Sequence, residues 1–137
     1  MRNFWQTDLF SNVVMFFMNF DKFCSDILNL NPKIRFATVY DEWGEKLAGG
    51  IRDGVENLLS PHAEKELVSL SVMDWKARKE MSKWLGKTIY TLGEYEKIKR
   101  FSFYLGLDNL LLVSTEKDAD TNEVVDGVIK LYYKNLE

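Results

Sequence analysis

The stretch between residues 60 and 85 most constrains the fold, because it predicts one long helix between two groups of strands. Ser60 followed by Pro61 forms a helix start, and Gly86 supplies the end. Apolar residues recur along the helix in two stripes, and a helix lying on a sheet buries one stripe, so the other needs a different cover. The stripe that we expect on the sheet is Ala63, Leu67, Leu70, Ala77, Met81 and Trp84, and the second is Val68, Val72 and Trp75.

Strands are predicted on both sides of this helix. Residues 34–40 alternate in the period of a strand, residues 41–44 form a short loop, and residues 45–51 return as its partner. After the helix, residues 88–95, 98–105 and 110–115 read as three strands joined by short turns.

Helices are also predicted at both ends of this pattern. Apolar residues at helical spacing begin at Phe20, and Pro32 prevents that helix from continuing. Asp120 with Glu123 forms a capping box before a final helix over 121–134, and Asp53 with Glu56 predicts a further short helix start. The predicted order is therefore one helix, a hairpin, the long helix, three strands and a helix.

Composition excludes several classes of function. The 137 residues suit one domain, and their net charge of −3 offers no global attraction to nucleic acid or to anionic membranes. Cys24 is the only cysteine and His62 the only histidine, so an intramolecular disulfide, a cysteine-rich zinc site and a multi-histidine metal site are excluded. We find no catalytic motif and expect neither enzyme activity nor a cofactor. The cysteine usage fits a cytoplasmic protein.

The first 19 residues stand apart from the domain pattern. Their apolar run at 13–18 is shorter than the roughly twenty residues that span a bilayer. We expect a helical or extended segment over 1–19 that packs on the domain or on a partner, and a single domain over 20–137. Met18 is an alternative natural start.

The order of elements resembles the profilin-like architecture of roadblock-type dynein light chains, longin domains and, more loosely, PAS sensors. The resemblance implies an α+β fold with a five-stranded antiparallel sheet in the order 2-1-5-4-3 and helices on both faces. The segment FCSDILNLNPKIRFATVYDEWGEKLAGGIRDGVENLLSP, with WKARK and GEYEKIKR, is also similar to an uncharacterised archaeal domain family. One long interior helix is nearer to the roadblock plan than to PAS domains, which place several short helices there.

The hairpin and the turn after it hold the first candidate site. Gly49, Gly50 and Arg52 could hold an anion at a helix start, although neither GxxxxGK[ST] nor GxGxxG is present. The structural alternative is a strand-to-helix turn in which Arg52 pairs with a nearby carboxylate, and we favour it. Trp43 at the hairpin tip either folds back on the sheet, which we favour, or contacts a partner.

Two further groups of residues admit a functional or a structural interpretation. Lysines and arginines from Lys76 to Arg100 alternate with acidic residues, so a solvated helix face is favoured over nucleic-acid binding. Aromatic residues on the strands and the long helix either line a ligand pocket or form plain core, which we favour. These are Trp75, Tyr90, Phe101, Phe103 and Tyr104.

These observations predict a non-catalytic cytoplasmic interaction module that self-associates and scaffolds a protein partner. The resemblance to roadblock proteins implies a homodimer built on the long helix and its neighbouring strand, and partners such as small GTPases. We expect Val68, Val72 and Trp75 in the dimer interface, unless residues 1–17 cover them. The alternative is a PAS-like sensory domain that binds a small ligand between the sheet and the long helix.

Overall fold

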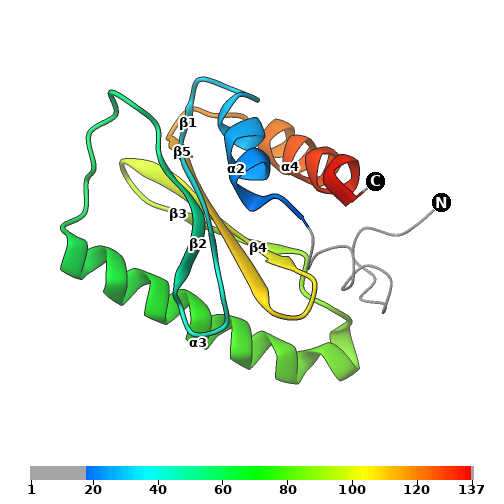
Figure 1. Cartoon of the computed structure of the whole chain (residues 1–137). Helices are drawn as coiled ribbons and strands as arrows, with labels where there is room; N and C mark the ends of the chain where they lie inside the picture. The colour runs from blue at the N-terminus through cyan, green and yellow to red at the C-terminus, as the bar shows by residue number, and fades with distance from the viewer. Residues whose placement is uncertain (1–17, 137) are drawn as a thin grey trace.

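A computed structural model describes residues 18–136, and within them five strands form one antiparallel sheet in the order β2-β1-β5-β4-β3. This arrangement confirms the predicted α+β class and strand order. Helices α2 and α4 cover one face of the sheet, and α3 crosses the other face (Figure 1). The elements are α2 Phe20–Leu28, β1 Ile34–Tyr40, β2 Lys46–Ile51, α3 Pro61–Leu85, β3 Tyr90–Glu94, β4 Ile98–Leu105, β5 Asn109–Glu116 and α4 Thr121–Leu136.

The main core lies between the sheet and helices α2 and α4. Phe101 and Phe103 of β4 are fully buried there, together with Phe23 of α2 and Val128 of α4. Burying one such large side chain contributes about 1.5–3 kcal/mol, so this layer supplies most of the apolar stabilisation. Phe101 and Phe103 therefore belong to the core, as the favoured interpretation of the strand aromatics predicts.

On the other face, α3 contacts the sheet through the stripe that the sequence predicts in a dimer interface. Val68, Val72 and Trp75 are only 5%, 7% and 3% exposed, and they pack with Tyr40 and Tyr104 of the sheet. The predicted roles of the two stripes are thus reversed. Tyr40 and Tyr104 already cover the sheet surface here, and Val68, Val72 and Trp75 complete an apolar layer with them, so the choice of stripe depends on side chains from distant strands.

The chain between β2 and α3 is irregular, so the short helix predicted at Asp53 is wrong. Gly54 has a φ of 79°, in the left-handed region that favours glycine, and the backbone N–H of Val55 donates to Arg52 O at 3.2 Å. A turn therefore forms where a helix would begin. Helix α3 begins only at Pro61, with the N–H of Ala63 donating to Ser60 Oγ at 3.1 Å.

The other predicted helix ends are confirmed. Gly86 has a φ of 83° after α3, and its N–H donates to Ser82 O at 2.8 Å. Before α4, the N–H of Glu123 donates to Asp120 Oδ1 at 3.0 Å. Within the part of the chain that the structure describes, no helix combines the length and the apolar composition needed to cross a membrane. The predictions for residues 1–17 lie outside the described residues.

Candidate functional site

Arg52 acts as a structural clamp on backbone carbonyls. Its Nε donates to Ile34 O at 2.8 Å, and one terminal nitrogen donates to Asn31 O at 3.0 Å and to Leu28 O. Leu28 is the last residue of α2, where a cation is favoured by the partial negative charge of a helix C-terminus. The predicted carboxylate partner is therefore wrong, and the guanidinium instead holds the end of α2 to the start of β1.

Gly49 and Gly50 lie inside β2 rather than at a strand-to-helix turn. Gly49 pairs with Thr38 and has a φ of 95°. A Cβ placed on it would lie 2.0 Å from Ala37 O, so the adjacent strand leaves no room for a side chain. Close approach of β1 and β2 accounts for glycine at this position without a ligand.

Trp43 does not fold back on the sheet, so the favoured prediction for this residue is wrong. It lies in the β1–β2 turn and its residue surface is 75% exposed, with Lys76 Nζ of α3 lying 5.6 Å from the ring centroid. The turn itself is well ordered by Asp41 Oδ1, which accepts from the N–H groups of Trp43 and Glu45 at 2.9 Å each. A large apolar ring is thus held in solvent on a rigid turn, which suits a contact residue.

The outer side of α3 carries a continuous apolar stripe. At about 100° per residue, these positions lie roughly opposite the buried line of Val68, Val72 and Trp75. All are exposed, and Trp84 reaches 69%. We call them the outer stripe, which consists of Leu70, Met73, Ala77, Met81 and Trp84.

A pocket of about 570 Å³ opens between the second half of α3, the β4–β5 turn and the segment that follows α3. Of the aromatics predicted to line a pocket, Trp75 and Tyr104 do so. Phe101 and Phe103 are buried on the α2/α4 side, and Tyr90 packs against that same core. The pocket is therefore placed at the end of the α3 layer and is not enclosed between the sheet and the helix.

Neither Cys24 nor His62 is among the described residues that line this pocket. Burial raises the pKa of the Cys24 thiol to about 12, so it stays protonated at neutral pH and is a weak nucleophile. His62 is exposed in the first turn of α3, and its Nε2 lies 2.8 Å from Glu66 Oε1 of the same helix.

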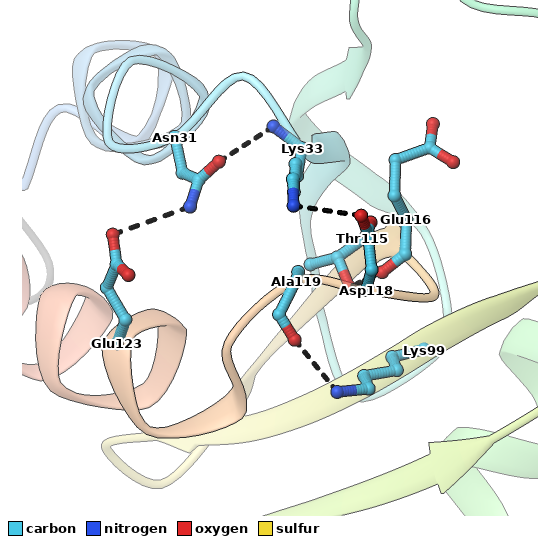
Figure 2. A network of polar contacts seen from close by, with 8 residues as sticks. All are labelled: Asn31, Lys33, Lys99, Thr115, Glu116, Asp118, Ala119 and Glu123. Carbon is cyan, nitrogen blue, oxygen red and sulfur yellow. Dashed lines mark hydrogen bonds and ion pairs between the residues drawn. The ribbon is translucent and has the colours of Figure 1, made fainter.

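Acidic residues around the start of α4 contact the loop between α2 and β1. Lys33 Nζ donates to Asp118 Oδ2 at 3.0 Å and lowers the pKa of that carboxyl, while Asn31 Nδ2 contacts Glu123 Oε1 at 3.5 Å (Figure 2). Lys99 Nζ donates to Ala119 O at 2.8 Å in the same network. Across residues 18–136, no cluster of three or more histidine, cysteine or acidic side chains is arranged to hold a metal ion.

Comparisons with solved structures support the fold. The Roadblock/LC7 domain from Streptomyces avermitilis has 14% identity and a TM-score of 0.64, covering 83% of this chain and 92% of that one. MglB from Myxococcus xanthus has 15% identity and a TM-score of 0.63, covering 85% and 93%. Profilin from Schizosaccharomyces pombe has 12% identity and a TM-score of 0.57, covering 85% and 95%.

No family model matches the chain, and no curated protein matches it. The structural matches confirm a roadblock/profilin-like fold, which is what identities this low can establish. The similarity to an uncharacterised archaeal family stays a prediction.

Proposed function

We propose that this chain is a non-catalytic protein-interaction module that self-associates through the outer stripe of α3 and scaffolds a protein partner. The outer stripe is the observation that carries the proposal. Its side chains stand in solvent on a helix whose opposite side is already fixed to the sheet, so the stripe serves no purpose in the packing of α3 on its own sheet.

The arrangement of the stripe favours a second copy of this chain as its occupant. It runs from Leu70 to Trp84, which is about 21 Å along a helix axis. Two such stripes related by a two-fold axis would bury each other, and each contact between them would occur twice, once for each copy. Burial of a residue such as Leu70 or Met73 contributes about 1.5–3 kcal/mol.

Structural neighbours support self-association of this fold. One matched structure is described as MglB with tetrameric arrangement, at 14% identity and a TM-score of 0.62, covering 95% of each chain. We take its assembly as a precedent for association between copies of this architecture. A small GTPase as the partner and a cytoplasmic location remain parts of the proposal, based on the likeness to roadblock proteins.

Trp43 offers a second surface on which the partner can bind. Tryptophan is enriched among the residues that dominate binding energy at protein interfaces. Its turn packs on the inner side of α3, where a Cβ added to Gly44 would lie 3.5 Å from Val68 Cγ1. The turn that carries Trp43 therefore contacts the same helix that carries the outer stripe.

Light scattering of the full chain at micromolar concentration tests the proposal. Met73→Glu and Met81→Glu each place a carboxylate in the outer stripe, and we expect both to shift the wild-type dimer to monomer. Val72→Glu is unsuitable, because burying a charge against the sheet would unfold the protein. Asn122→Glu, at an exposed position of α4, is the matched control and should remain dimeric.

Two outcomes contradict this assignment. A monomeric wild type would end the proposal of self-association. A dimer that persists in both methionine variants would place the interface on another surface. Circular dichroism of each variant separates loss of association from loss of folding.

A further inference from the structure

The side of α3 that faces the β1–β2 turn carries two exposed lysines. Lys76 and Lys83 are seven residues apart, so they lie on the same side of the helix, about 10.5 Å apart along its axis. Figure 1 shows the β1–β2 turn reaching the middle of this helix. Trp43 lies in that turn, and Lys76 Nζ lies 5.6 Å from its ring centroid. We call Trp43, Lys76 and Lys83 the basic flank.

Neither lysine of the basic flank forms an ion pair within the part of the chain that the structure describes. Lys76 contacts the Trp43 ring, and Lys83 Nζ lies 4.3 Å from the ring centroid of Trp84. A contact with an aromatic face orients an ammonium group but does not neutralise its charge. Both positive charges are therefore available to a carboxylate from outside the chain.

Trp43 adds exposed apolar surface next to these charges. The N–H of Trp43 donates to Asp41 Oδ1 at 2.9 Å, so the turn holds the ring in a defined place. The ring stays mostly exposed although Lys76 approaches it. Aromatic side chains bury a large apolar area when a partner covers them. The basic flank therefore offers a partner both positive charge and apolar area.

The surroundings favour a protein segment over a nucleic acid. The chain has a net charge of −3, and three glutamates lie close to the basic flank in the sequence: Glu42 and Glu45 around Trp43, and Glu80 between the two lysines. These carboxylates would repel a nucleic-acid backbone, which carries a negative charge at every phosphate. A protein segment can place carboxylates opposite the lysines and neutral side chains opposite the glutamates.

We infer that the basic flank binds an acidic helix of the partner protein, with two carboxylates seven residues apart opposite Lys76 and Lys83 and an apolar side chain against Trp43. This spacing equals that of the two lysines on α3, so both ion pairs can form when the two helices lie side by side. The inference rests on the proposed partner-binding role of Trp43 and names the chemistry of that partner. Lys76 lies about 100° around α3 from Ala77 of the outer stripe, so the two surfaces are separate.

Two-dimensional NMR of the full chain with a designed helical peptide tests the inference. The peptide carries two glutamates seven residues apart on a face that also bears leucines. One control peptide has glutamine at both positions, and another has the glutamates five residues apart, which places them on different sides of the helix. We expect a saturable shift of the Trp43 indole N–H with the first peptide and about tenfold weaker binding of both controls. The indole of Trp75, which is buried beneath α3, should not shift.

Charge-changing variants locate the binding. Lys76→Gln and Lys83→Gln should each weaken binding of the glutamate peptide about threefold, because exposed ion pairs are individually weak. Lys134→Gln removes the same charge from an exposed position of α4 and should bind as the wild type does. Lys76→Glu should weaken binding further, and a peptide with lysine in place of the facing glutamate should restore it.

Three results would overturn the inference. These are the absence of a saturable shift at Trp43, equal binding of the glutamate and glutamine peptides, and tighter binding of a single-stranded oligonucleotide than of the glutamate peptide. Light scattering keeps this test apart from the proposed self-association. A dimer that does not bind the peptide contradicts only the inference, and a monomer that binds it contradicts only the self-association.

Discussion

The two faces of the sheet differ in how much apolar surface the helices bury on them. On the α2/α4 face, two helices bury a broad apolar layer that includes Phe23, Phe101 and Phe103. On the α3 face, one helix makes its buried contacts through three residues near its middle, Val68, Val72 and Trp75. That face also buries two polar atoms, Arg100 Nε and Thr38 Oγ1. Neither has a hydrogen-bond partner among the described residues.

This difference indicates that the two faces have different roles. The α2/α4 face fixes the fold, whereas the α3 face leaves helix surface available on both sides of its second half. The outer stripe and the 570 Å³ pocket both lie along α3. A face that contributes less to stability can carry more surface for binding.

The largest expected effect comes from removing a core side chain on each face. Phe103→Ala should cost about 3–5 kcal/mol, since it removes a fully buried ring from the main core. Val72→Ala should cost about 2 kcal/mol, because it removes two methyl groups beneath α3. Urea denaturation of both variants measures the two losses in the free energy of unfolding. Equal losses would contradict the proposal that the α2/α4 face contributes more to stability than the α3 face.

An effect smaller than that of Phe103→Ala is expected at Arg52, which holds the end of α2 to the start of β1. Arg52→Ala should lower the free energy of unfolding by about 2 kcal/mol, because three carbonyls lose a charged donor. Thermal melts should show the same loss with and without phosphate. Stabilisation of the wild type alone by phosphate would instead indicate an anion site at Arg52, with Arg52→Lys as the variant that keeps the charge.

The smallest expected effect is on the pH dependence of the free energy of unfolding. Cys24 on the α2/α4 face and Lys87 on the α3 face should change it in opposite directions. Burial raises the pKa of Cys24 to about 12, so the unfolded chain releases this proton first and stability falls as pH rises above about 8.5. The pKa of Lys87 is lowered to about 8, so the folded chain releases that proton first and stability rises between pH 8 and 10. Each group contributes at most about 1.4 kcal/mol per pH unit.

Comparing the wild type with Cys24→Ala and Lys87→Gln separates the two contributions. The cysteine variant should lose less stability than the wild type as the pH rises from 8 to 10, and the lysine variant should lose more. The same sign in both variants would contradict the assigned burial of one of the groups.

The sequence predicted the element order and the helix caps at Ser60, Gly86 and Asp120 because these depend on local chemistry and hydrophobic period. It did not predict which stripe of α3 faces the sheet. Both stripes have helical spacing, and the choice depends on Tyr40 and Tyr104, which reach the contact from distant strands. A long-range contact of this kind leaves no local pattern.

The candidate sites were less predictable for the same reason. The pairing of Arg52 with the carbonyl groups of residues before it depends on tertiary structure, as does the meeting of Lys79 with the β4–β5 turn. One signal was available: the buried line of α3 continues to Lys79 and Ser82, which marks where the helix stops packing on an apolar surface.

Disulfide cross-linking at the middle of the outer stripe tests the central claim most directly. In a two-fold pairing of the stripes, Ala77 faces its own copy, and two cysteines form a disulfide only when their Cα atoms lie within about 7 Å. Ala77→Cys should therefore convert to a covalent dimer under mild oxidation at micromolar concentration, while Asn122→Cys should not, and the buried Cys24 should stay reduced. If Ala77→Cys forms no more covalent dimer than Asn122→Cys, α3 does not pair through this stripe and the account is wrong.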